Sequence, residues 1–205
     1  MMDHRFIRNR LGIHKPDTEI FREDYNLNPG MDPDGPLTAA AVLVPLVLHD
    51  EGITALFTQR TKRMTKHSGQ ISFPGGHVDD VDINAEATAL RETEEEVGID
   101  RAHIEIIGRL DCYVIRTGFL VTPVVGLLKP PFNITPDDHE VDEVFEVPLH
   151  FLMDPKNHKR HSRELNGQNR EYYAMPYKDR YIWGATAGML VNLHDILNAP
   201  AEINA

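Results

Sequence analysis

Four carboxylates stand close together in residues 91–99, which read Arg-Glu-Thr-Glu-Glu-Glu-Val-Gly-Ile. On a helix, residues three and four apart are neighbours, so Glu92, Glu95 and Glu96 would share one face. Glu94 would project about 100° away from the nearest of the three. Clustered negative charges are unfavourable unless a cation neutralises them. The pattern therefore indicates a site for a hard divalent cation, Mg²⁺ or Mn²⁺, because such ions prefer oxygen ligands.

A divalent cation at this place would determine the chemistry. Such ions polarise a phosphoryl group, activate water and orient a leaving group. Arg91 is one turn before Glu95 and is expected to hold it through a bidentate pair. The alternative interpretation is a solvated acidic helix face without a ligand.

The acidic segment needs a helix to present it, and residues 84–97 are expected to form one. Asp82 or Asn84 can cap its start, and Gly98 suits the left-handed residue that ends a helix. At about 100° per residue, the core-facing stripe opposite the carboxylates is expected to consist of Ile83, Ala87, Leu90 and Val97.

Hydrophobic patterning places further elements around this helix. We expect strands at 39–48, 53–60, 70–73, 104–110, 119–128 and 141–147, a helical turn at 148–153 and a helix at 185–197. Pro45 lacks an N–H and is expected at a sheet edge or a bulge. The interspersed elements predict an α/β fold with a mixed β-sheet between helices.

The proline- and glycine-rich stretch 26–36 divides the chain. Residues 1–36 are expected to be an N-terminal extension and loop, and residues 37–205 the main domain.

The acidic segment resembles the Nudix box, G-x5-E-x7-R-E-U-x-E-E-x-G-U, in which U is aliphatic. The matching residues are Gly76, Arg91, Glu92, Glu95, Glu96, Gly98 and Ile99. Thr93 replaces an aliphatic residue, and one extra residue between Gly76 and Arg91 puts Asp82 in the place of the early Glu. The resemblance implies a Nudix-type α/β/α sandwich that hydrolyses a pyrophosphate bond, with Glu92, Glu95 and Glu96 as metal ligands.

The extra residue and the preceding segment are similar to the coenzyme A pyrophosphatase branch of the Nudix family. Residues 60–76 read RTKRMTKHSGQISFPGG, close to a branch pattern that ends in H-x-G-Q-[IV]-[SA]-F-P-G-G, although Thr65 replaces a usual basic residue. The resemblance implies cleavage of coenzyme A or its derivatives to 3′,5′-ADP and 4′-phosphopantetheine. ADP-ribose or another nucleoside diphosphate derivative is the alternative substrate, and a nucleotide sensor without activity is the alternative function.

The same resemblance implies roles for further residues. Substrate contacts are expected from Arg60, His67, Gln70, Gly75 and Gly76, although His67 could equally be structural. Glu140, in a later acidic segment, is expected to complete the metal shell or to act as the base, with Glu95 as the other candidate base. Trp183 is expected to pack in the core or an interface, with adenine stacking as the alternative.

Composition limits the other classes of function. There are 21 Lys and Arg against 32 Asp and Glu, a formal charge of −11, which argues against a main task of binding nucleic acid. A lone cysteine, Cys112, no signal-like N-terminus and no apolar run of membrane-spanning length predict a cytoplasmic protein without membrane contact. A small-molecule nucleotide of the coenzyme A type is the expected partner, and a homodimer is left open.

Overall fold

The computed structural model describes residues 3–16, 22–23, 27–28, 35–63, 69–115, 117–165 and 167–200. Within them, a mixed main sheet has the strand order β1-β7-β8-β2-β3-β4, and β5, β6 and β9 pair with β2, β8 and β3. Its strands are β1 (Arg22–Glu23), β2 (Thr38–His49), β3 (Gly52–Arg60), β4 (Ile71–Ser72), β5 (Gly75–His77), β6 (Ile104–Arg109), β7 (Tyr113–Ile115), β8 (Phe119–Leu128) and β9 (Val141–Pro148). A second, antiparallel sheet contains β10 (Lys159–Leu165), β11 (Gln168–Tyr177) and β12 (Arg180–Trp183).

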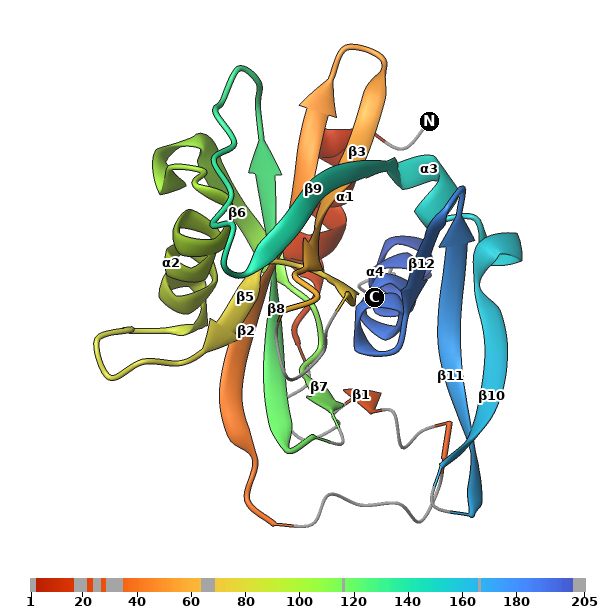
Figure 1. Ribbon diagram of the computed structural model, residues 1–205. Coiled ribbons are helices and arrows are strands. Elements are labelled where there is room, and N and C mark those ends of the chain that lie inside the picture. Colours follow the sequence, from red (N-terminus) through yellow and green to blue (C-terminus); the bar gives the residue numbers. More distant parts are fainter. Residues whose placement is uncertain are drawn as a thin grey trace.

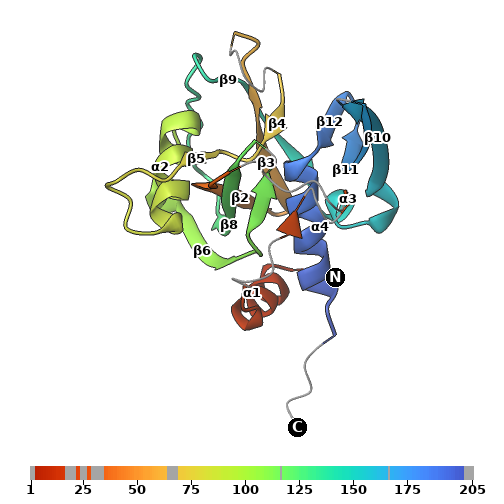
Figure 2. The same ribbon diagram turned by 90° about the horizontal axis from the view of Figure 1, so that it is seen from below.

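Helices cover both faces of the main sheet (Figures 1 and 2). Helix α2 (Ala85–Val97) packs on one face, and α1 (His4–Ile13), α3 (Leu149–Leu152) and α4 (Ala185–Asn198) pack on the other. Two 3₁₀ turns, η1 (Arg101–His103) and η2 (Pro155–Asn157), connect elements. This arrangement confirms the predicted α/β/α sandwich with a mixed sheet between helices.

Strand β2 is the centre of this architecture because it is buried on both faces. Alternate residues belong to different clusters: Ala41 and Leu43 pack with α2, whereas Val44 and Leu46 pack on the side of α4. A two-sided burial of this kind explains the continuous apolar run in the sequence.

Pro45 lies inside this central strand, so its predicted place at a sheet edge is wrong. It pairs with Gly126 of β8, and the other side of β2 pairs with β5 up to Val42 and with β3 from Leu46. Leu43 donates its N–H to the Pro74 carbonyl on that other side, and the N–H of Pro45 would point the same way. The missing donor therefore falls in the gap between two ladders, where no partner strand needs it.

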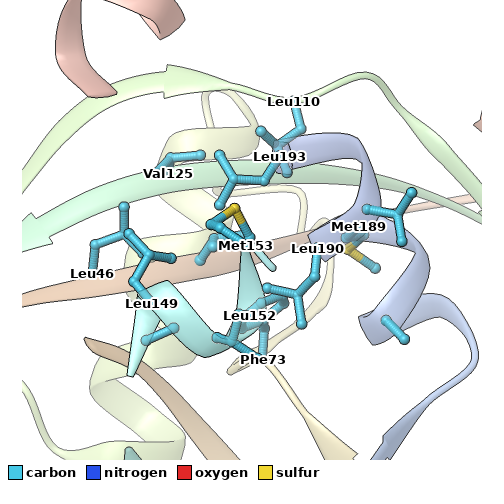
Figure 3. Close-up of a cluster of buried hydrophobic side chains, with 14 of the residues drawn as sticks. Leu46, Phe73, Leu110, Val125, Leu149, Leu152, Met153, Met189, Leu190 and Leu193 are labelled. Atoms are coloured by element: carbon cyan, nitrogen blue, oxygen red, sulfur yellow. The ribbon is translucent and has the colours of Figure 1, made fainter. Parts of the chain in front are cut away.

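The larger core lies between the main sheet, α3 and α4 (Figure 3). Leu46 of β2 and Val125 of β8 meet Leu152 of α3 and Leu190 and Leu193 of α4 in this cluster. Helix α4 also contacts β11 and β12, so it lies between the main sheet and the second sheet. The core thus fixes the second sheet relative to the first.

The N-terminal segment contributes to the same core. Ile7 and Leu11 of α1 are buried, and Arg10 donates to the carbonyl oxygen of Ile196 near the end of α4. His14 Nε2 lies 2.9 Å from Asp111 Oδ1. The described part of the expected extension is therefore packed against the main body.

Most predicted elements appear in the structure near their expected bounds. Strands β1, β5 and β7 and the three strands of the second sheet were not predicted. No helix in the described ranges is both long enough and apolar enough to cross a membrane.

Candidate active site

Helix α2 begins where its capping residues predict. The Asn84 side chain accepts a hydrogen bond from the Ala87 N–H at 2.8 Å, and Gly98 ends the helix with φ 70°. The predicted core stripe is wrong at Ile83, which is 89% exposed. Ile83 precedes the cap and belongs to a loop, so the helical angle does not apply to it.

Val97 is buried as predicted, and the buried face of α2 also includes side chains that the stripe left out: Thr88, Ala89, Thr93 and Glu96. Thr93 donates its hydroxyl to the Ala89 carbonyl, and Thr88 donates to Asp82. These hydrogen bonds satisfy the polar atoms, which allows both threonines to be buried. Ala87 and Leu90 are only half-buried.

Glu96 points into the protein, contrary to the prediction that it lies opposite the core. Glu96 is 4% exposed, and its carboxylate accepts from the Gly75 N–H at 3.3 Å and from Arg60 Nη1 at 3.4 Å. Burial raises the pKa of Glu96 to about 7, although Arg60 and the Gly75 N–H counteract the effect. Nearby Glu140 and Glu92 raise this pKa further.

Arg91 organises the exposed side of the cluster. Its Nη1 lies 2.9 Å from one oxygen of Glu92 and 2.9 Å from one oxygen of Glu95. Its bidentate partner is Asp82 and not Glu95 as predicted, with Nε to Oδ1 at 3.2 Å and Nη2 to Oδ2 at 2.9 Å. The loop before α2 presents both Asp82 oxygens to one edge of the guanidinium, whereas Glu95 meets only the remaining nitrogen.

Glu140 joins the cluster from the loop before β9. Thr61, at the end of β3, donates its N–H to the Glu140 carbonyl at 2.9 Å, and Arg60 Nη2 lies 3.6 Å from the Glu140 carboxylate. Arg60 thus stands between Glu96 and Glu140. Burial raises the pKa of Glu92 despite its pairing with Arg91, and Glu95 and Glu140 add to the rise.

The donor set fits a divalent cation by charge. The guanidiniums of Arg60 and Arg91 are paired with four carboxylates, and Arg91 is also paired with Asp82. Negative charge is therefore in excess. The four are Glu92, Glu95, Glu96 and Glu140. Their mutual repulsion and burial raise two of the pKa values, and a bound cation would lower both.

The carboxylate oxygens of Glu92, Glu95 and Glu96 do not converge on one point. Glu92 and Glu95 turn to Arg91, whereas Glu96 turns to Gly75 and Arg60. In the part of the chain that the structure describes, three potential ligand atoms lie within 4.8 Å of one another only in the exposed turn 137–139, next to Glu140. Assignment of the helix carboxylates as metal ligands remains a prediction.

A pocket of about 360 Å³ adjoins this cluster. Three of the predicted substrate contacts line it, namely Arg60, Gln70 and Gly75. Gly76 lies beside it, where a side chain would overlap the Glu92 carboxylate. His67 is outside the described residues. The pocket is therefore connected to the acidic helix through Arg60 and Gly75.

Sequence reasoning missed two arginines on the far wall of the pocket, Arg163 of β10 and Arg170 of β11, which lie directly opposite each other. The dipeptide Asn166-Gly167 is a strong hairpin signal and could have predicted this pairing. Trp183 also lines the pocket and does not lie in the core.

Comparisons with known proteins agree with this geometry. A family model described as the NUDIX domain matches residues 37–166. The chain belongs to the Nudix hydrolase family. An Escherichia coli K12 protein described as the uncharacterized Nudix hydrolase NudL is 40% identical over 155 residues, 75% of this chain and 80% of that protein. A Pectobacterium atrosepticum protein of the same description is 36% identical over 174 residues, 85% of this chain and 90% of that protein.

Solved structures are similar at lower identity. A Caenorhabditis elegans Ap4A hydrolase complex shares 24% identity with a TM-score of 0.48 over 54% of this chain and 80% of its own. A MutT protein from Methanosarcina mazei shares 20% identity with a TM-score of 0.46 over 60% of this chain and 84% of its own.

Family membership establishes the activity class of this Nudix hydrolase as hydrolysis of phosphoric anhydride bonds, which in this family generally uses divalent metal ions. The family match ends at residue 166, so Arg170, Trp183 and α4 belong to the segment that follows it. This Nudix chain therefore builds part of its pocket from residues outside the matched region.

Proposed function

We propose that this Nudix hydrolase cleaves the pyrophosphate bond of coenzyme A or its derivatives and releases 3′,5′-ADP and 4′-phosphopantetheine. The observation that supports the proposal is the position of Arg60. It contacts Glu96 and Glu140 of the acidic cluster and also lines the pocket. A diphosphate held by Arg60 would therefore lie at the carboxylates, with the nucleotide in the pocket. Arg60, Gln70 and Gly75, which belong to the stretch that resembles the coenzyme A branch, line the pocket at this junction.

The acidic side chains have separate tasks in this proposal. Glu92, Glu95 and Glu96 would hold Mg²⁺ or Mn²⁺, and the ion would neutralise the diphosphate and make water a better nucleophile. Glu95 or Glu140 takes the proton from the attacking water, since both carboxylates are accessible to solvent. Arg91 keeps Glu92 and Glu95 in position.

The remaining groups bind and orient the substrate. Arg60 offers a guanidinium to the phosphate oxygens and stabilises the charge that develops during attack. Gly75 lines the pocket and Gly76 follows it beside the Glu92 carboxylate, so the backbone of both would lie close to the bound diphosphate. No side chain needs to form a covalent intermediate with phosphorus.

A substrate panel tests the proposal. The purified protein is incubated with Mg²⁺ or Mn²⁺ and with coenzyme A, acetyl-coenzyme A, ADP-ribose or a dinucleoside polyphosphate, and products are identified by mass spectrometry. We expect coenzyme A or its thioester to have the highest kcat/KM and to yield 3′,5′-ADP. Cleavage of ADP-ribose with no cleavage of coenzyme A would overturn the proposal, and binding without cleavage of any substrate would favour the sensor.

A further inference from the structure

The hairpin of β10 and β11 places two positive charges side by side. Arg163 and Arg170 are register partners, so their Cβ atoms are expected about 5 Å apart. Like charges directly opposite on a sheet are destabilising. Both line the pocket that Arg60 enters from the other wall, in a protein with a net charge of −11. Three guanidiniums around one pocket indicate an anionic ligand there.

The guanidinium of Arg163 is oriented by aromatic rings. Its central carbon lies 4.9 Å from the centre of the Trp183 ring and 6.0 Å from the centre of the Tyr172 ring. Such a cation–π contact leaves the guanidinium N–H groups available to an oxyanion. Within the described ranges, no carboxylate is paired with Arg163.

The start of α4 adds to the positive potential of the same wall. Gly184, Ala185 and Thr186 line the pocket, and Gly184 at the cap position supplies no side chain to the first N–H groups of the helix. The N-terminal end of a 14-residue helix carries a partial positive charge. It supports the arginine pair and would not define a site without it.

We infer that this wall binds a second phosphate of the substrate, separate from the diphosphate that is cut. Its identity as the 3′-phosphate of the adenosine ribose rests on the proposed function. Arg163 and Arg170 then act as specificity residues: they hold the 3′-phosphate, while Arg60 holds the diphosphate on the opposite side of the pocket. The nucleoside lies between them, within reach of Trp183.

Kinetics with coenzyme A and dephospho-coenzyme A, which lacks the 3′-phosphate, test the inference. In the unaltered protein, kcat/KM should favour coenzyme A at least about tenfold, the size of one charge-assisted hydrogen bond. Arg163→Gln and Arg170→Gln should each reduce this ratio about tenfold, and Arg163→Lys should keep part of it. If the arginines had a merely structural role, the substitutions would lower kcat/KM equally for both substrates and leave the ratio unchanged.

The matched control is Arg160→Gln. Arg160 lies on the same strand but on the opposite face, where its guanidinium stacks on Tyr173. The Arg160→Gln substitution should leave the ratio of kcat/KM for the two substrates unchanged. The same loss of preference in Arg160→Gln as in Arg163→Gln would overturn the inference, as would an unaltered protein that does not distinguish the two substrates. Melting curves show whether the Arg170→Gln variant is folded. If it is not, the test uses the Arg163→Gln variant alone, because Arg163 is exposed.

Calorimetry without turnover separates this inference from the proposed function. Adenosine 3′,5′-bisphosphate should bind at least tenfold more tightly than adenosine 5′-monophosphate, and Arg163→Gln should abolish the difference. If coenzyme A is not cleaved but this difference is found, the proposed function fails and the phosphate site stands. Equal binding of the two nucleotides overturns the site, whatever the enzyme cleaves.

Discussion

Arg91 and Asp82 are joined by two parallel hydrogen bonds that fix the guanidinium plane beneath the carboxylates of Glu92 and Glu95. These bonds hold the pKa of the Asp82 carboxyl far below its usual range. Asp82 occupies the place of the early Glu in the box, one residue further from Arg91 than usual. Its contacts identify it as the anchor of Arg91.

Substitution Asp82→Asn should therefore lower kcat about 10- to 100-fold, because the loss of an anchor beyond the direct ligands has effects of this size. KM should change less, since the pocket is untouched. Asp80→Asn, on the exposed part of the same loop, is the matched control and should retain full activity. Equal kcat for the two variants would show that the anchor is dispensable.

The acidic helix offers an internal control for metal binding. Glu92→Gln, Glu95→Gln and Glu96→Gln should each lower kcat at least about a hundredfold and weaken Mn²⁺ binding in calorimetry, because each removes a candidate ligand. Glu94→Gln should do neither, since Glu94 is paired with Arg101 on another face. Chelation should abolish activity and excess Mg²⁺ should restore it. Activity that survives chelation would contradict the metal assignment.

Burial of Glu96 predicts how the stability of the metal-free protein depends on pH. Its pKa is about 7 when folded and near the ordinary 4.5 when unfolded, so between these values the folded state binds the extra proton. The free energy of unfolding should therefore fall as pH rises from about 5 to 7, by up to about 3 kcal/mol. Melting temperatures measured with chelator across this range test the sign.

The Glu96→Gln variant is the control for that experiment and should lose most of the pH dependence. Saturating Mg²⁺ should have the same effect on the unaltered protein, because a cation stabilises the carboxylate. A melting temperature of the metal-free protein that rises between pH 5 and 7 would contradict the assignment.

The two neighbouring glycines should respond differently to alanine. At Gly75 a Cβ would collide with the backbone of Ala41 and Val42, so Gly75→Ala should destabilise the protein by about 2 kcal/mol or more. At Gly76 the nearest atoms that a Cβ would meet belong to the Glu92 carboxylate, the far end of a flexible side chain. Gly76→Ala should therefore lower kcat with little change in melting temperature. A large loss of stability in Gly76→Ala would argue against this distinction.

The N-terminal helix should matter for stability and not for chemistry. Leu11→Ala removes a buried side chain and should cost about 3 kcal/mol, or about 10 °C in melting temperature. Phe6→Ala, on the exposed side of α1, should cost much less. If the two variants melt at the same temperature, α1 is a loosely attached extension.

Local signals in the sequence were sufficient for the acidic helix. Asn84 and Gly98 fix its ends, and the spacing of the glutamates determines that they lie near one another. Orientation was not predictable in the same way: Glu96 is buried because β3 and β5 supply Arg60 and the Gly75 N–H as partners. Such partners come from tertiary structure, so a count of angles along one helix cannot reveal them.

The pocket shows a second limit of prediction from the sequence. Its near wall includes Arg60, Gln70 and Gly75, three predicted contacts that lie close together in the sequence. Its far wall depends on the register of a hairpin and on where α4 places the second sheet. Arg163 and Arg170 are seven residues apart in a strand-rich segment. Neither has a neighbouring residue that marks it as a ligand contact.

The contact between α1 and α4 has a consequence for biosynthesis. Arg10 donates to the carbonyl of Ile196, 186 residues later, and Ile7 and Leu11 share a core with that helix. Until α4 has been synthesised and has left the exit tunnel, the apolar side of α1 therefore lacks this partner. Chaperone capture of nascent chains should concentrate on this segment and should cease only after the last helix has left the exit tunnel.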